Sequence, residues 1–132
     1  MCYTKNILPK WRDWNMNAKN LLTIPVTEGE YGSVLEMLYY SVENCKFDVM
    51  EHEDFGKMQH LSILNTLRHR FSKKIGANKT LSFKTSEVSC FLAYINLFLP
   101  TLTEKETLDE LASVKEKIKE CWLCQEGLAQ PQ

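Results

Sequence analysis

Residues 81–100 read LSFKTSEVSCFLAYINLFLP, and the change of pattern within this stretch decides the fold. The first five residues alternate between apolar and polar side chains, which is typical of a strand with one buried face. The residues that follow are apolar on nearly all sides of a helix. We therefore expect a strand over 81–85 and then a helix over about 86–99, which Pro100 ends.

A helix that is apolar all round is expected to be shielded from water on every side. Three other helices and a small ribbon could cover helix 86–99 within one chain. Otherwise a second copy or a partner covers one of its sides, and we then expect Phe91, Tyr94 and Phe98 to contribute contact surface. The sequence leaves both alternatives open.

The strand over 81–85 has a counterpart earlier in the chain. Residues 22–28 read LTIPVTE and residues 81–87 read LSFKTSE, so in both an alternating strand leads into a hydroxyl side chain and a glutamate. A hydroxyl followed by a glutamate is typical of a helix start, and Thr27 with Glu30 three positions later predicts a capping box. We expect the earlier strand to cover 21–26, with Pro25 confining it to a sheet edge. The two strands could pair into a ribbon, which needs packed helices to be stable.

Three further helices complete the predicted architecture. The first covers about 28–44, the second about 55–75 and the last about 103–125, and an acidic loop over 46–54 separates the first two. Each predicted helix has apolar side chains at the three- and four-residue spacing that gives one buried face. The sequence therefore predicts a mainly α fold with four principal helices and a small two-stranded β ribbon.

Length and composition set the domain organisation. At 132 residues the chain is long enough for one domain with a continuous core. Hydrophobic residues make up 44% of the chain and charged residues 25%, which is close to the globular average and argues against disorder throughout. We expect a polar lead-in over 1–20, a single helical domain over 21–125 and a flexible tail over 126–132.

Localisation is predicted from patterns that the sequence lacks. Residues 1–10 have no apolar run behind a basic start, and the longest apolar stretch, 90–99, is too short to span a bilayer. The five cysteines are an odd number at scattered positions, which does not suggest a disulfide framework. We therefore expect a small soluble domain in the cytoplasm, without membrane association and with its cysteines as thiols.

Charge is segregated along the chain, although the net charge is only −1. Residues 27–54 hold eight acidic residues and one lysine, whereas residues 55–86 hold seven basic residues and no acidic residue. The basic segment could bind nucleic-acid phosphates, and the candidate residues are Arg68, Arg70, Lys73, Lys74, Lys79 and Lys84. The alternative is that these charges pair with the acidic helix 28–44, where each exposed pair contributes little.

The strand–helix–helix order resembles that of ribbon-helix-helix DNA-binding proteins. Two features depart from that family. The loop over 46–54 is longer than the family's tight turn, and the first strand offers Leu21, Thr23 and Pro25 in place of polar side chains that read bases. We therefore assign the chain to no family on this resemblance.

Cys121 and Cys124 form a Cys-x-x-Cys motif, which suggests redox or metal chemistry. The motif lies at the C-terminal end of the last predicted helix, where the helix dipole disfavours a thiolate. No second pair of cysteines or histidines supplies the remaining ligands of a zinc site. A thiol or metal protein is therefore a third hypothesis for function, and we assign no catalytic residue, cofactor or metal ligand.

The sequence favours a non-catalytic interaction or regulatory module, acting as a homo-oligomer or as an adaptor. Trp11 and Trp14 lie three positions apart on one side of a possible helical turn, so they could anchor a partner or pack onto the domain. The predicted partner-binding residues are Trp11, Trp14, Phe91, Tyr94 and Phe98. Nucleic-acid binding through the basic segment is the alternative.

Overall fold

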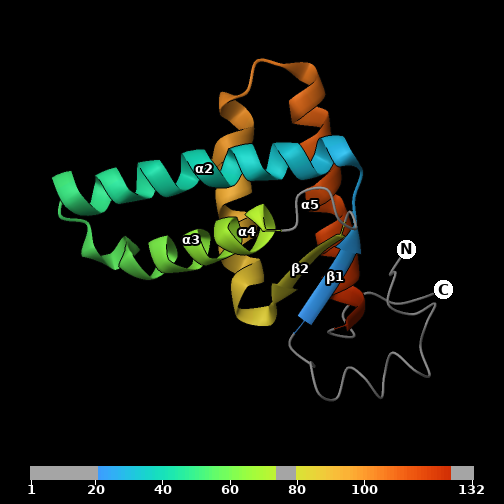
Figure 1. The fold of residues 1–132 in the computed structure, drawn as a ribbon, viewed down its shortest axis with the longest axis horizontal. Coiled ribbons are helices and arrows are strands. Elements are labelled where there is room, and N and C mark those ends of the chain that lie inside the picture. Colours follow the sequence, from blue (N-terminus) through green and yellow to red (C-terminus); the bar gives the residue numbers. More distant parts are fainter. Residues whose placement is uncertain (1–20, 74–79, 126–132) are drawn as a thin grey trace.

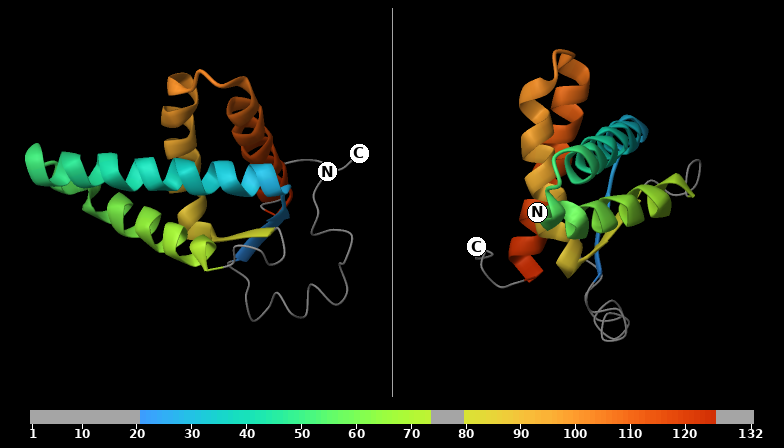
Figure 2. Two further views of the ribbon diagram at one scale, coloured as in Figure 1. Left: turned by 45° about the horizontal axis from the view of Figure 1, so that its top comes forward. Right: turned by 90° about the vertical axis from the view of Figure 1, so that its left-hand side faces the viewer.

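Two helical hairpins cross each other, and a two-stranded ribbon lies beside the crossing (Figure 1 and Figure 2). The computed structural model describes residues 21–73 and 80–125, of which 123–125 are described by their backbone alone. Within these residues the elements are β1 (Leu21–Pro25), α2 (Glu28–Glu51), η2 (Phe55–Lys57), α3 (Met58–Ser72), β2 (Thr80–Lys84), α4 (Thr85–Phe98), η3 (Leu99–Thr101) and α5 (Lys105–Gln125). The predicted mainly α fold, with four principal helices and a small ribbon, is confirmed.

The ribbon consists of β1 and β2, which pair antiparallel with Thr23 opposite Ser82. The hydroxyl oxygens of these two residues lie 3.1 Å apart on the outer face of the ribbon. Alternate residues face the helices because successive strand side chains point to opposite sides. The four apolar side chains on this inner face are almost completely buried: Leu22, Ile24, Leu81 and Phe83.

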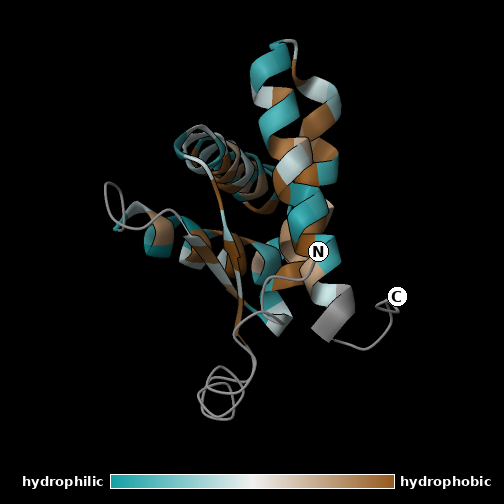
Figure 3. Ribbon diagram, turned by 90° about the vertical axis from the view of Figure 1, so that its right-hand side faces the viewer, coloured by the Kyte–Doolittle hydropathy of each residue, from teal (hydrophilic) through white to brown (hydrophobic). Residues whose placement is uncertain are grey.

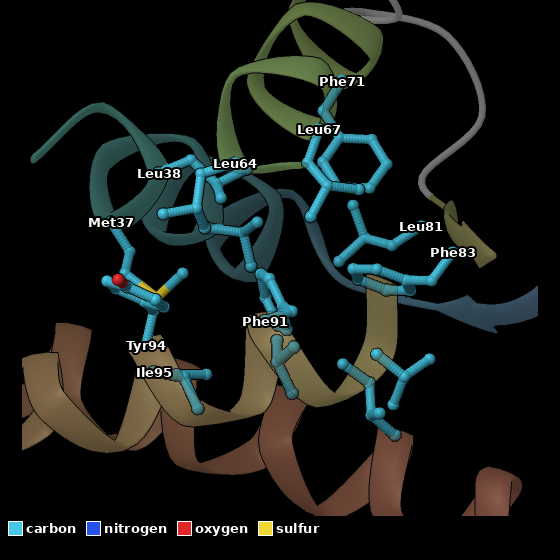
Figure 4. Close-up of a cluster of buried hydrophobic side chains, with 14 of the residues drawn as sticks. Met37, Leu38, Leu64, Leu67, Phe71, Leu81, Phe83, Phe91, Tyr94 and Ile95 are labelled. Atoms are coloured by element: carbon cyan, nitrogen blue, oxygen red, sulfur yellow. The ribbon is translucent and has the colours of Figure 1, made fainter. Parts of the chain in front are cut away.

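The core lies between the inner face of the ribbon and the four long helices, α2 to α5; Figure 4 shows the part formed by the ribbon, α2, α3 and α4. The ring of Phe83 contacts both neighbouring helices, with its centroid 5.5 Å from Phe71 and 4.8 Å from Phe91. Burying side chains of this size contributes about 1.5–3 kcal/mol each. Figure 3 shows the most hydrophobic residues mainly where the elements face one another. Among the described residues, no helix is long and apolar enough to cross a membrane.

A buried glutamate fixes the junction between β1 and α2. The Oε1 atom of Glu30 accepts the backbone N–H of Thr27 at 2.9 Å, and the Thr27 hydroxyl accepts the Glu30 N–H in return. The Nζ atom of Lys117 on α5 lies 2.8 Å from the same carboxylate and also donates to the carbonyl of Pro25. The predicted capping box at Thr27 is therefore present, and a cation from a distant helix completes it.

The junction between β2 and α4 is built in the same way. The Oε1 atom of Glu87 accepts the backbone N–H of Lys84 at 2.7 Å. Arg70 on α3 makes two hydrogen bonds of 2.8 Å to the Glu87 carboxylate and a third of 2.9 Å to the carbonyl of Ser82. A bidentate pair of this kind is both strong and directional. Each strand-to-helix turn thus holds a buried carboxylate and a cation supplied by another helix.

Helix α2 continues to Glu51, so the predicted loop over 46–54 is wrong for its first six residues. The spacing of buried apolar residues continues to Val49, which keeps the helix packed on its neighbours. The chain then turns at Glu53, whose φ of 55° lies in the left-handed region. Two backbone N–H groups of this turn donate to the carbonyl oxygen of Asp48.

Helix α4 is buried on one flank only, so the expectation that one chain shields it on every side is wrong. The flank that carries Phe91 and Ile95 packs into the core. The opposite flank is exposed and carries Ser89, Ala93, Asn96 and Leu97. Leu97 is 66% exposed, which leaves most of an aliphatic side chain in water. Cover by a partner, the other alternative from the sequence, stays a prediction.

Candidate functional site: a groove between α2 and α4

An open groove of about 460 Å³ runs between α2 on one side and α4 with η3 on the other. The α2 side is lined by residues about one helical turn apart, including Tyr40, Asn44 and Asp48. The opposite side is formed by α4 and η3, where Leu97 and Phe98 line the groove. Concave sites of this size, apolar with a few polar groups, are typical of binding sites.

The apolar part of the groove is only partly covered. Tyr40 is 48% exposed, and its ring stacks on that of Phe98 with the centroids 6.1 Å apart and the planes 23° apart. Leu97 lies in the same lining. An exposed aliphatic side chain beside an aromatic pair in a concavity marks an interaction surface more strongly than a single exposed apolar residue would.

An ion pair forms the polar part of the groove. The Nζ atom of Lys57 lies 2.7 Å from the Asp48 carboxylate and 3.8 Å from that of Asp54. The hydrogen bond from Lys57 lowers the pKa of Asp48, and the same bond raises the pKa of Lys57. Both side chains are therefore charged at neutral pH, and Asp48 is neutralised by its partner.

Tyr94, which lines the groove, contacts two further titratable side chains, one of them the exposed His60. The hydroxyl of Tyr94 lies 3.0 Å from the Nδ1 atom of His60 and 3.8 Å from the Sγ atom of Cys45. Burial raises the pKa of Tyr94 and that of Cys45, and it raises the pKa of Cys90 to about 11. A thiol or phenol that keeps its proton is a poor nucleophile or base. These thiols and the phenol therefore supply no activated nucleophile at neutral pH.

The predicted partner-binding aromatics of α4 lie at different depths. Phe91 is fully buried against Phe83, so its ring is already covered within the chain and offers no contact surface. Tyr94 is buried beneath the groove, although its edge lines it. Phe98 is half-buried and reaches the groove surface. The other two predicted residues, Trp11 and Trp14, lie outside the described residues.

The sequence does not predict the two exposed large hydrophobic side chains of the groove, Leu97 and Tyr40. Leu97 counts there only as one of the apolar residues of the predicted helix 86–99, and the predicted partner-binding residues do not include Tyr40. A signal for Tyr40 is present, because Tyr40 and Phe47 are seven positions apart on the side of α2 opposite its buried stripe. Phe47 is also about half exposed. Nothing in the sequence marks which flank of α4 stays open.

Four of the six predicted nucleic-acid-binding residues are described, and one of these four, Arg70, is paired with a carboxylate within the chain. The guanidinium of Arg70 is neutralised by Glu87, and Arg68 donates to the side chain of Asn65. Lys73 and Lys84 are exposed, while Lys74 and Lys79 lie outside the described residues. In the described part of the chain, the acidic helix α2 and the basic segment form one close ion pair, Lys57–Asp48.

The cysteine motif is only partly described. Cys121 is fully buried in the core, and the side chain of Cys124 lies outside the described residues. Over 21–73 and 80–122, no three His, Cys, Asp or Glu side chains are grouped closely enough to hold a metal ion. The hypothesis of a thiol or metal protein gains no support from this placement.

No protein-family model matches the chain, and comparison with curated proteins and with solved structures gives no match either. We therefore argue function from the chain's own residues.

Proposed function

We propose that the chain is a protein-interaction module whose groove between α2 and α4 receives apolar side chains of a protein partner. The exposure of Leu97 beside the stacked pair of Tyr40 and Phe98 carries this proposal. Covering such side chains is favourable by about 25 cal/mol for each Å² of apolar surface removed from water. Aromatic residues are also enriched at the centres of protein interfaces.

The polar residues of the site fit binding better than catalysis. Asp48 and Lys57 neutralise each other, and the thiol and phenol beneath the groove hold their protons at neutral pH. Such groups can orient a partner through hydrogen bonds. These four side chains provide no base or nucleophile with a pKa near neutrality.

The test compares two variants with matched changes. Leu97→Asp places a charge in the groove, and Met50→Asp makes the same kind of change at a 71% exposed residue near the end of α2. Met50 does not line the groove. The wild-type chain and both variants are used to capture proteins from a native lysate, with and without nuclease.

We expect Leu97→Asp to lose the proteins that the wild-type chain and Met50→Asp retain, irrespective of nuclease. Equal capture by Leu97→Asp would contradict the proposed site. Capture that disappears with nuclease would support the alternative hypothesis of nucleic-acid binding.

A further inference from the structure

We infer that the partner received by the groove is a basic amphipathic helix. This inference rests on the proposed function and specifies the partner. It begins from the exposed face of α2, along which Glu36, Tyr40, Glu43, Phe47 and Glu51 follow one another at steps of three or four residues. Residues at this spacing share one face of a helix. Three carboxylates therefore alternate with two aromatic rings along this face, which borders the groove at Glu36 and Tyr40.

The negative charge of this face is not neutralised within the described chain. Glu36 and Glu51 have no ion-pair partner among residues 21–73 and 80–122. Glu43 lies 3.7 Å from Lys46 in an exposed pair, which contributes little. Asp48, by contrast, is matched by Lys57 inside the groove. The groove thus has a neutral polar end at Asp48 and Lys57, and it lies beside an acidic face of α2 that reaches its lining at Glu36.

The shape of the site fits a helix. From Glu36 to Asp48 the α2 side of the groove extends over 12 residue steps, or roughly 18 Å at the helical rise of 1.5 Å. About three turns of a partner helix would cover this length. Its apolar side chains would contact Leu97 and Tyr40, and lysines or arginines beside them would face the glutamates of α2. This is the helix-in-groove mode of recognition, with charge setting the orientation.

The negative charge of this face also argues against a second copy of the chain, an anionic lipid surface or a nucleic acid as the occupant of the groove. In a two-fold dimer through this face, the glutamates of one copy would meet those of the other, because both copies contribute the same patch. Like charges placed in contact oppose association. An anionic lipid surface or a nucleic acid would be repelled for the same reason. A basic peptide is the occupant that both the apolar and the acidic residues favour.

The test uses defined peptides as probes. The first is a fluorescein-labelled peptide of about 18 leucines and lysines, with leucine at helical spacing so that one face is apolar. The second carries glutamate in place of every lysine, and the third has the first composition in an order that removes the apolar face. Binding to the full chain is measured by fluorescence anisotropy at low and at high salt.

Two charge-reversal variants are compared with the wild-type chain. Glu36→Lys with Glu43→Lys reverses the acidic face, and Asp109→Lys with Glu116→Lys makes the same change of net charge on α5. Both pairs are exposed and seven residues apart. Asp109 and Glu116 take part only in exposed ion pairs with lysines, so we expect their replacement to be tolerated. Circular dichroism is used to check that both variants fold.

We expect the basic amphipathic peptide to bind at least tenfold more tightly than the acidic or the reordered one. Charge reversal at Glu36 and Glu43 should weaken the binding of this peptide by at least tenfold and reduce the salt dependence of its affinity. Reversal on α5 should change the affinity less than threefold. Equal weakening by both variants would overturn the inference, because net charge alone would then explain binding.

Two further outcomes separate this inference from the proposed function. If the acidic peptide binds as well as the basic one and Leu97→Asp removes both, the groove is a binding site but its partner is not basic. If sedimentation shows a dimer of the wild-type chain that Leu97→Asp dissociates, the occupant is a second copy and the inference is wrong. If no peptide binds and Leu97→Asp captures the same proteins as the wild-type chain, both proposals fail.

Discussion

The ribbon side and the groove side of the molecule differ in how far their apolar side chains are exposed to water. At the ribbon, Leu22 and Phe83 are buried and the buried carboxylates of Glu30 and Glu87 have hydrogen-bonded cations. At the groove, Leu97 and Tyr40 remain largely in water. The ribbon side therefore contributes folding stability, whereas the groove side keeps apolar surface available for binding. A change at one side should affect stability, and a change at the other should affect association.

The largest expected effect is on the ribbon side. Phe83→Ala removes a ring that packs between Phe71 and Phe91 and leaves a cavity, which should cost about 3–5 kcal/mol of unfolding free energy. Leu97→Ala is the matched change at the groove and should cost less than about 1 kcal/mol. Urea denaturation followed by circular dichroism measures both values. Similar losses for the two variants would remove the distinction between the two sides.

The next effect concerns the buried ion pair of the second junction. Arg70→Met leaves the Glu87 carboxylate buried without its cation, and we expect a loss of about 2 kcal/mol or more. Lys105→Met breaks a well exposed pair with Asp109 and should change stability by less than about 0.5 kcal/mol.

A double-mutant cycle measures the energetic coupling between Arg70 and Glu87. Arg70→Met combined with Glu87→Gln should cost less than the sum of the single changes, because the second change removes the unpaired charge. Additive losses would show that the two side chains do not depend on each other.

Acid should weaken the two strand-to-helix junctions on the ribbon side. Burial raises the pKa values of Glu30 and Glu87, but their cations and backbone hydrogen bonds outweigh burial, so both pKa values lie below the usual value of 4.5. The unfolded chain then binds more protons than the folded chain in this range, and stability increases with pH. The stabilisation is complete above pH 4.5 and is lost as the pH falls through the lower folded pKa values.

Urea midpoints at neutral pH and at several values below 4.5 measure this loss. Glu87→Gln should show a shallower decline in stability than the wild-type chain, because one of the carboxyl groups with a lowered pKa no longer titrates. An unchanged slope would mean that Glu87 does not contribute to acid sensitivity.

The smallest stability effect should come from the groove. Leu97→Asp replaces a 66% exposed side chain on the open flank of α4, so its urea midpoint should stay close to that of the wild-type chain while its capture of partners is lost. A large loss of stability would indicate that Leu97 packs within the chain.

Local chemistry explains the parts of the fold that the sequence predicted. The Thr27–Glu30 capping box depends on residues three positions apart. The alternation of apolar and polar residues in the second strand indicates that the face carrying Leu81 and Phe83 is buried. The parts that escaped prediction depend on tertiary contacts. The pairing of Arg70 with Glu87 joins residues 17 positions apart on different helices. The apolar pattern of α4 gives no indication of which flank its neighbours leave open, and so the groove could not be placed from it.

The central claim is that the open flank of α4 is a binding surface. It is tested most directly by nuclear magnetic resonance of leucine and methionine methyl groups while the basic amphipathic peptide is titrated into the wild-type chain. We predict the largest shifts at Leu97 and Leu102, which line the groove, and small shifts at Met50 and Met58. The largest shifts at Met50 and Met58, with none at Leu97, would contradict the account.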